Sequence, residues 1–144
     1  MRLTAFTDFG LRTLMRLAAE PDRHLSTEAL ATELAISRNH LLKVVQALAE
    51  TGFVRTLRGA HGGVALARPP EAIRMGAVAR ALEGDQPLVE CFRGDGGCAC
   101  TLLPSCRLRS ALAQAQDAFY ATLDRLTLAD CAVTLPAIRP APVP

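Results

Sequence analysis

Residues 26–66 of this chain run STEALATELAISRNHLLKVVQALAETGFVRTLRGAHGGVAL. Ser26 and Ser37 are typical helix N-cap residues, and each is followed by apolar residues at helical spacing. The pattern predicts a short helix after Ser26, a tight connection at residues 35–36 and a helix from Ser37 to about Glu50. The residues of this last helix that we expect to face inward are Leu41, Leu42, Val44, Val45 and Leu48. Two helices joined so closely form a helix-turn-helix pattern.

The residues that follow predict a β-hairpin. Residues 53–57 are rich in β-formers, residues 58–63 contain three glycines that suit a turn, and residues 64–67 make a plausible return strand. A hairpin directly after a helix-turn-helix is a wing. We therefore predict a mainly α-helical fold with a small β-hairpin wing, a winged helix-turn-helix.

The flanking segments complete the predicted organisation. A first helix over residues 6–20, capped by Thr7 or Asp8, precedes the helix-turn-helix. A short helix over residues 75–82 follows the wing, and a long helix runs from Arg107 to about Leu126. Its apolar residues step at heptad spacing: Leu108, Leu112, Ala115, Phe119, Leu123 and Leu126. This seam favours a homodimer, and the alternative is a helix that packs on its own domain.

Three regions follow from this pattern. Residues 1–70 would form the winged helix-turn-helix domain, and residues 71–135 would form the cysteine-bearing loop and the dimerisation helix. Residues 136–144 contain four of the nine prolines and are expected to form a disordered tail.

The charge distribution and the third helix favour DNA as a partner. Residues 1–68 carry nine Lys/Arg against six Asp/Glu, a net charge of +3, whereas the whole chain has only +2. In a recognition helix the N-terminal residues contact bases, so Arg38 can pair with guanine and Asn39 with adenine. Lys43 suits a phosphate, and Arg58 at the wing suits a minor groove. The predicted DNA-binding residues are Ser37, Arg38, Asn39, His40, Lys43, Arg55, Arg58 and His61.

The sequence also indicates the cellular compartment of the protein. The N-terminal residues do not resemble a signal peptide, and no apolar run approaches the roughly 20 residues that span a bilayer. We expect a cytoplasmic protein with no membrane partner, in which thiols stay reduced. Five cysteines under such conditions indicate metal or redox chemistry before disulfides.

Four of these cysteines, Cys91, Cys98, Cys100 and Cys106, lie within 16 residues and are separated by 6, 1 and 5 residues. The spacing contains no C-x2-4-C pair of the kind usual in structural zinc sites, whereas iron–sulfur clusters accept wider spacings. An iron–sulfur cluster is favoured, with zinc and a metal-free thiol switch as alternatives. A C-x-x-C redox enzyme does not fit, because Cys98 and Cys100 are too close in sequence. Cys131 stands apart and suits a buried apolar position.

Four motifs in order resemble the winged-helix transcriptional regulators of the Rrf type: MRLTAFTDFGLRTLMRLA, SRNHLLKVVQALAETGFV, RGAHGG and LLPSCRLRSAL. The resemblance covers roughly residues 1–130. Some members sense cluster status and use a His shortly after the last cysteine. Here Arg107-Leu108-Arg109 follows Cys106, which makes the chain more similar to the nitric-oxide-sensing members.

The resemblance implies a ligand set. Cys91, Cys100 and Cys106 would bind the cluster, with 4Fe-4S preferred to 2Fe-2S, and Asp8 of the partner subunit would be the fourth ligand. The chain departs from the family pattern because Cys91 and Cys100 are nine positions apart instead of five or six. Cys98, in the extra length, is therefore an alternative ligand.

The function implied is a DNA-binding transcriptional regulator, a repressor and not an enzyme. It would bind a palindromic double-stranded operator as a homodimer and respond to nitric oxide through its cluster. The alternatives are a redox- or cluster-sensing regulator of the same family and a metal-free thiol-switch repressor.

Overall fold

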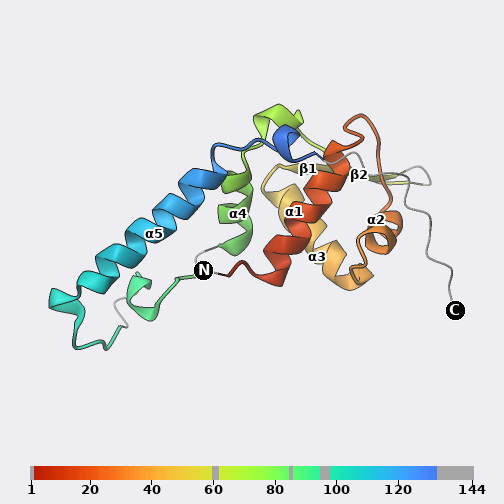
Figure 1. The fold of residues 1–144 in the computed structure, drawn as a ribbon. Helices are drawn as coiled ribbons and strands as arrows, with labels where there is room; N and C mark the ends of the chain where they lie inside the picture. Colours follow the sequence, from red (N-terminus) through yellow and green to blue (C-terminus); the bar gives the residue numbers. More distant parts are fainter. Residues whose placement is uncertain (1, 60–61, 85, 95–97, 133–144) are drawn as a thin grey trace, which may run out of the picture.

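The computed structural model describes residues 2–59, 62–84, 86–94 and 98–132. The main elements are α1 (Ala5–Ala18), α2 (Thr27–Glu33), α3 (Arg38–Glu50), β1 (Val54–Leu57), β2 (Gly63–Leu66), α4 (Met75–Glu83) and α5 (Arg107–Leu123). Short 3-10 helices lie at Pro70–Ala72, Glu90–Phe92, Leu103–Ser105 and Ala129–Cys131. Helices α1 to α4 and the hairpin form a head, and α5 extends from the α4 side of it (Figure 1). The predicted fold class is confirmed.

The helix-turn-helix consists of α2 and α3, with the N-caps that the sequence predicts. The Ser26 hydroxyl accepts a hydrogen bond from the Ala29 amide at 3.0 Å, and the Ser37 hydroxyl accepts one from His40 at 3.3 Å. Between the helices, Ala35 adopts a positive φ of 52° and Ile36 is buried. The left-handed residue reverses the chain, and the buried Ile36 fixes the turn to the core.

The wing is the antiparallel pair β1 and β2, in which Val54 pairs with Leu66 and Leu57 with Gly63. Leu25, just before α2, forms an additional bridge to Val64 through two backbone hydrogen bonds of 3.0 and 2.8 Å. This bridge, which the sequence pattern did not indicate, joins the wing to the start of the helix-turn-helix.

One core unites the head. Helix α1 contacts both α3 and α4, and the largest fully buried side chains include Leu14, Leu17, Leu30, Leu41, Leu48, Val64 and Ile73. Leu42 was expected to face inward, and that prediction is wrong: its side chain is 43% exposed. Leu41 and Val44 fill the core face of α3, and Leu42 lies beyond the edge of that stripe.

The start of α1 also differs from the prediction. The N-cap is Thr4, not Thr7 or Asp8, and its hydroxyl accepts a hydrogen bond from the Thr7 amide at 3.2 Å. Glu83, at the end of α4, accepts hydrogen bonds from the Thr4 amide at 2.8 Å and from its hydroxyl at 3.0 Å. The cap is therefore shared between α1 and α4, a long-range contact that local sequence patterns do not contain.

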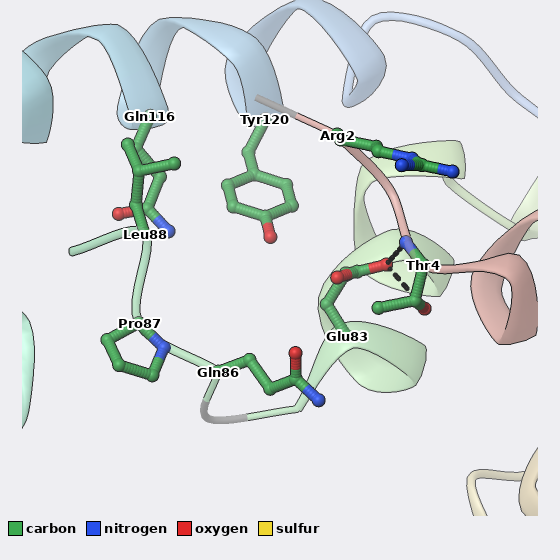
Figure 2. Close-up of a pocket in the computed structure, with 8 residues that line it drawn as sticks. All are labelled: Arg2, Thr4, Glu83, Gln86, Pro87, Leu88, Gln116 and Tyr120. Carbon is green, nitrogen blue, oxygen red and sulfur yellow. Dashed lines mark hydrogen bonds between the residues drawn. The ribbon is translucent and has the colours of Figure 1, made fainter. Parts of the chain in front are cut away.

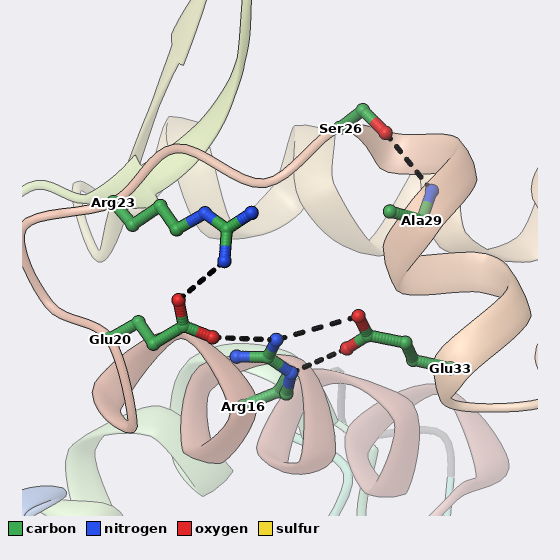
Figure 3. A network of polar contacts seen from close by, with 6 residues as sticks. All are labelled: Arg16, Glu20, Arg23, Ser26, Ala29 and Glu33. Carbon is green, nitrogen blue, oxygen red and sulfur yellow. Dashed lines mark hydrogen bonds and ion pairs between the residues drawn. The ribbon is translucent and has the colours of Figure 1, made fainter. Parts of the chain in front are cut away.

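A chain of ion pairs joins α1 to α2 (Figure 3). The Arg16 guanidinium lies between Glu33 of α2 and Glu20, and Glu20 also pairs with Arg23 at 2.7 Å. The hydrogen bond from Arg16 to Glu33 raises the pKa of the guanidinium. Only 10% of the Arg16 side chain is exposed, so this pair is better shielded from solvent than a typical surface ion pair.

Helix α5 is attached to α4 by a polar contact at its C-terminal end. Both amino groups of the Arg80 guanidinium donate to Asp124, at 2.9 and 2.6 Å, and the guanidinium stacks 4.7 Å from the Tyr120 ring centroid. The Arg80 hydrogen bonds lower the pKa of Asp124. Helix α5 ends at Leu123, three residues before the predicted end, and the Leu126 carbonyl beyond it accepts a hydrogen bond from the Met75 amide at 3.0 Å.

No residue of α5 is fully buried in the single chain. Leu123, at the end of α5, packs against the core of the head, whereas Leu108, at the start of the predicted seam, is 65% exposed. Among the helices that the structure describes, none is long and apolar enough to cross a membrane.

Gly76 permits the close approach of α4 and α5. A Cβ there would collide with the Asp124 carboxylate and lie 2.9 Å from the Tyr120 carbonyl oxygen. Alanine is the better helix former by about 1 kcal/mol, but overpacking costs roughly 1–3 kcal/mol. We expect Gly76→Ala to unfold at lower urea concentration than the wild type, whereas Ala77→Ser on the exposed side of α4 should change the midpoint little. A midpoint for Gly76→Ala equal to or above the wild-type value would contradict this packing.

Candidate DNA interface and metal centre

The predicted recognition surface is the N-terminal part of α3. The side chains of Arg38, Asn39, His40 and Lys43 are all exposed there. Arg38 lies 3.8 Å from Glu28 of α2, and both side chains are more than half exposed. Such an ion pair contributes little, so Arg38 remains able to turn towards a ligand.

His40 has a second contact besides its exposed edge. Its ring centroid lies 6.2 Å from that of Phe9 on α1, with the planes inclined by 34°. Aromatic pairs interact favourably over separations of about 4.5–7 Å. His40 therefore connects the recognition helix with α1. Its partner on α1, Phe9, directly follows Asp8 in the sequence.

Two of the basic residues predicted to bind DNA from the wing are exposed to solvent. Arg55 on β1 and Arg58 just beyond it are exposed, and the three residues of β1 after Val54 all lie outside the core. His61 lies outside the described residues. Arg68, in contrast, is engaged with the head: it donates to the Gly52 carbonyl at 3.0 Å and stacks 4.8 Å from the Phe53 ring centroid.

The cysteine loop precedes α5 and lies at the far end of that helix from the head (Figure 1). Cys91, Cys98 and Cys106 are half-buried and Cys100 is exposed. Arg109, in the first turn of α5, lies 3.4 Å from the Cys91 carbonyl oxygen and 5.6 Å from the Phe92 ring centroid. These contacts, which the sequence pattern did not indicate, hold the start of the loop against α5.

The donor chemistry of the loop fits a soft metal centre. None of its four cysteines, all of which are described, forms a disulfide, and thiolates are the usual ligands of iron–sulfur clusters, zinc and copper(I). Within the described part of a single chain, however, no three metal-ligating side chains converge. The loop thus supplies the right ligand type, without a preformed cage in one chain.

Asp8 lies in the first turn of α1 and is half-buried. Arg12, one turn later, holds its carboxylate at two points: Nη2 lies 2.6 Å from Oδ2, and Nε lies 3.1 Å from Oδ1. In the single chain Asp8 is therefore an ion-pair partner and does not form a group with the cysteines.

A pocket of about 260 Å³ lies where α5 leaves the head. Arg2, Glu83 and Tyr120 line it from the N-terminal arm, α4 and α5, and the Tyr120 hydroxyl points into it (Figure 2). Glu83 is already engaged with Thr4. The described lining includes none of the predicted site residues, so the pocket belongs to the junction between α5 and the head.

The fold and these two surfaces define a class: a winged-helix transcriptional regulator that binds DNA. Residues 3–134 match the Rrf2 family, described as "Iron-dependent Transcriptional regulator", and the chain belongs to this family.

Among curated relatives, the HTH-type transcriptional regulator NsrR of Geobacillus kaustophilus is 43% identical over 131 residues, covering 90% of this chain and 88% of the relative. NsrR of Bacillus licheniformis is 41% identical over 140 residues, covering 96% and 97%.

Two solved structures have a similar fold. T. potens IscR superimposes with a TM-score of 0.72 at 24% identity, covering 90% of this chain and 85% of that one. CymR, the global cysteine regulator of B. subtilis, gives a TM-score of 0.70 at 26% identity, covering 92% and 96%.

The cysteines differ in accessibility, and this difference can be tested. Cys131 packs against the core but is only half-buried, less than the buried position that its apolar surroundings predict, and burial raises the pKa of its thiol, with Asp130 adding to the effect. Because the thiolate is the reactive form, iodoacetamide should alkylate exposed Cys100 several times faster than Cys131 in reduced, metal-free protein. Peptide mass spectrometry over time measures both rates. Equal rates, or faster modification of Cys131, would contradict the described packing.

Proposed function

We propose that this chain is a homodimeric, cytoplasmic repressor that binds a palindromic operator and releases it when nitric oxide reaches an iron–sulfur cluster held by residues 91–106. The observation that carries the proposal is the position of the four-cysteine loop, which directly precedes α5, the helix that joins the winged head through Arg80 and Asp124. The family's description as iron-dependent and the relatives named NsrR support it.

The dimer would form through α5. Its apolar seam includes Leu108, which is 65% exposed, and no residue of α5 is buried in the single chain. Covering such a seam with a second copy removes apolar surface from water. A twofold dimer would also place two α3 helices about one DNA turn apart, as a palindromic operator requires.

We assign the ligands as Cys91, Cys100 and Cys106 of one subunit, with Asp8 of the partner as the fourth and Cys98 as the alternative. The loop lies at the end of α5 away from its own head (Figure 1), which favours a fourth ligand from another subunit. When bound, the cluster, 4Fe-4S by preference, would supply iron that reacts with nitric oxide and absorbs visible light.

Residues of α1 and α3 would couple the reaction of the cluster with nitric oxide to the affinity for DNA. As a ligand, Asp8 would leave Arg12 and hold α1 in one pose; once released, it would return to the ion pair that the single chain contains. Phe9, next to Asp8, contacts His40 on α3, so a change in the position of α1 would reach the recognition helix. A coupling free energy of about 1–3 kcal/mol would change DNA affinity roughly 5- to 150-fold.

Cluster loading of single variants tests the ligand set. After anaerobic purification and reconstitution, the single variants Cys91→Ala, Cys100→Ala and Cys106→Ala should each lose most of the iron, the sulfide and the visible absorbance. Each variant lacks one thiolate ligand, and solvent does not replace a thiolate. Cys98→Ala and the control Cys131→Ala should load like the wild type. Loss of the cluster in Cys98→Ala with retention in Cys100→Ala would exchange the roles of these two residues.

Asp8→Ala tests the fourth ligand, and Asp22→Ala on the surface is its matched control. We expect Asp8→Ala to load less cluster or to respond to nitric oxide at a different rate in the visible spectrum. Unchanged loading together with an unchanged response would remove Asp8 from the ligand set. A colourless wild-type protein that binds operator DNA and responds to oxidants would instead support the thiol-switch alternative.

The DNA surface predicts two different mutant phenotypes. Arg38→Ala should cost about 1–3 kcal/mol on the operator and relax the preference for guanine at one position, since a bidentate base contact is lost. Lys43→Ala should weaken binding to all sequences and reduce the slope of log K against log salt by about 1. Fluorescence anisotropy titrations at several salt concentrations separate the two. The assignment fails if both variants lose only sequence-independent affinity.

A further inference from the structure

We propose that Leu42 contacts the methyl group of a thymine in the major groove and so contributes a preference for T at one position of each operator half-site. This inference rests on the proposed role of α3 as the recognition helix. It assigns a specificity contact to a residue whose sequence pattern suggested only a core position.

The exposure of Leu42 is the first observation. The core face of α3 is formed by Leu41, Val44, Val45 and Leu48, which are at most 5% exposed. Leu42 is 43% exposed, so the core leaves a large part of this apolar residue open to solvent. A single exposed leucine is ordinary on a protein surface, and its location therefore carries the argument.

That location is the face predicted to contact bases. Residues three and four apart on a helix are neighbours, so Leu42 lies one turn from both Arg38 and Asn39 and beside them on the same face. Those two residues are exposed and polar, as is Lys43. Leu42 is thus an apolar side chain within the polar, N-terminal part of α3.

The chemistry of the major groove contains a match for such a side chain. Arginine and asparagine pair with hydrogen-bonding edges of guanine and adenine, whereas the C5-methyl group of thymine is the apolar feature of the groove. A leucine cannot hydrogen-bond to a base edge, but it can bury a methyl group. Burial of one such group is worth a factor of about four in affinity.

The test uses anaerobically purified, full-length dimer with its cluster. High-affinity duplexes are first enriched from a random DNA pool. Each thymine of one half-site is then replaced in turn by deoxyuridine, which lacks only the methyl group. We expect one replacement to weaken wild-type binding about fourfold.

Two variants assign this loss to a residue. Leu42→Ala and Leu42→Gln should each bind the duplex with thymine and the duplex with deoxyuridine at that position with equal affinity. Both alanine and glutamine are good helix formers, so α3 should remain intact in both variants. The control is Leu57→Ala on the wing, because Leu57 is 44% exposed, nearly the same as Leu42. Leu57→Ala should keep the fourfold difference.

The alternatives give distinct results. If Leu42→Ala and Leu42→Gln both retain the wild-type sensitivity to deoxyuridine, or if no position shows any, Leu42 does not contact a thymine methyl group, while the proposed function stands. If no duplex is enriched by a folded, cluster-loaded wild type, the proposed function fails and this inference fails with it.

Discussion

Helix α1 packs on α3 and α4 at the same time, and this double contact determines where the DNA surface lies relative to α5. Its buried face includes Leu14 and Leu17, and burial of each such side chain contributes about 1.5–3 kcal/mol. The polar contacts of α1 extend the same arrangement: Thr4 is bound to Glu83 of α4, and Arg16 to Glu33 of α2. A force on α1 would therefore act on the recognition helix and on the dimerisation helix together.

The local parts of the fold were predictable because local chemistry determines them. Ser26 and Ser37 cap their helices as expected, and the glycine-rich segment after Leu57 joins the two strands. Thr4 was missed because its cap depends on Glu83, 79 residues away. The inward prediction for Leu42 was wrong because its neighbours in sequence are apolar, and only the orientation of α3 decides which of them reach the core.

The site was predictable in composition but less so in geometry. Crowded cysteines indicate a soft metal whatever the fold, and the N-terminal residues of α3 are exposed as a DNA surface requires. Convergence of ligands depends on the loop's path and, in our proposal, on a second subunit, neither of which residue spacing determines. The ion pair between Asp8 and Arg12 likewise gives Asp8 a partner within its own helix, a competitor to any metal.

In our proposal, the state of the cysteine loop controls the DNA affinity of the winged head. We would measure operator binding by the anaerobic, cluster-loaded protein. Fluorescence anisotropy would give the affinity before and after addition of stoichiometric nitric oxide, and the visible spectrum would be recorded in the same cuvette. We expect the loss of the cluster absorbance and a roughly 5- to 150-fold loss of operator affinity to occur together. A cluster that reacts with nitric oxide while operator affinity stays unchanged would contradict it.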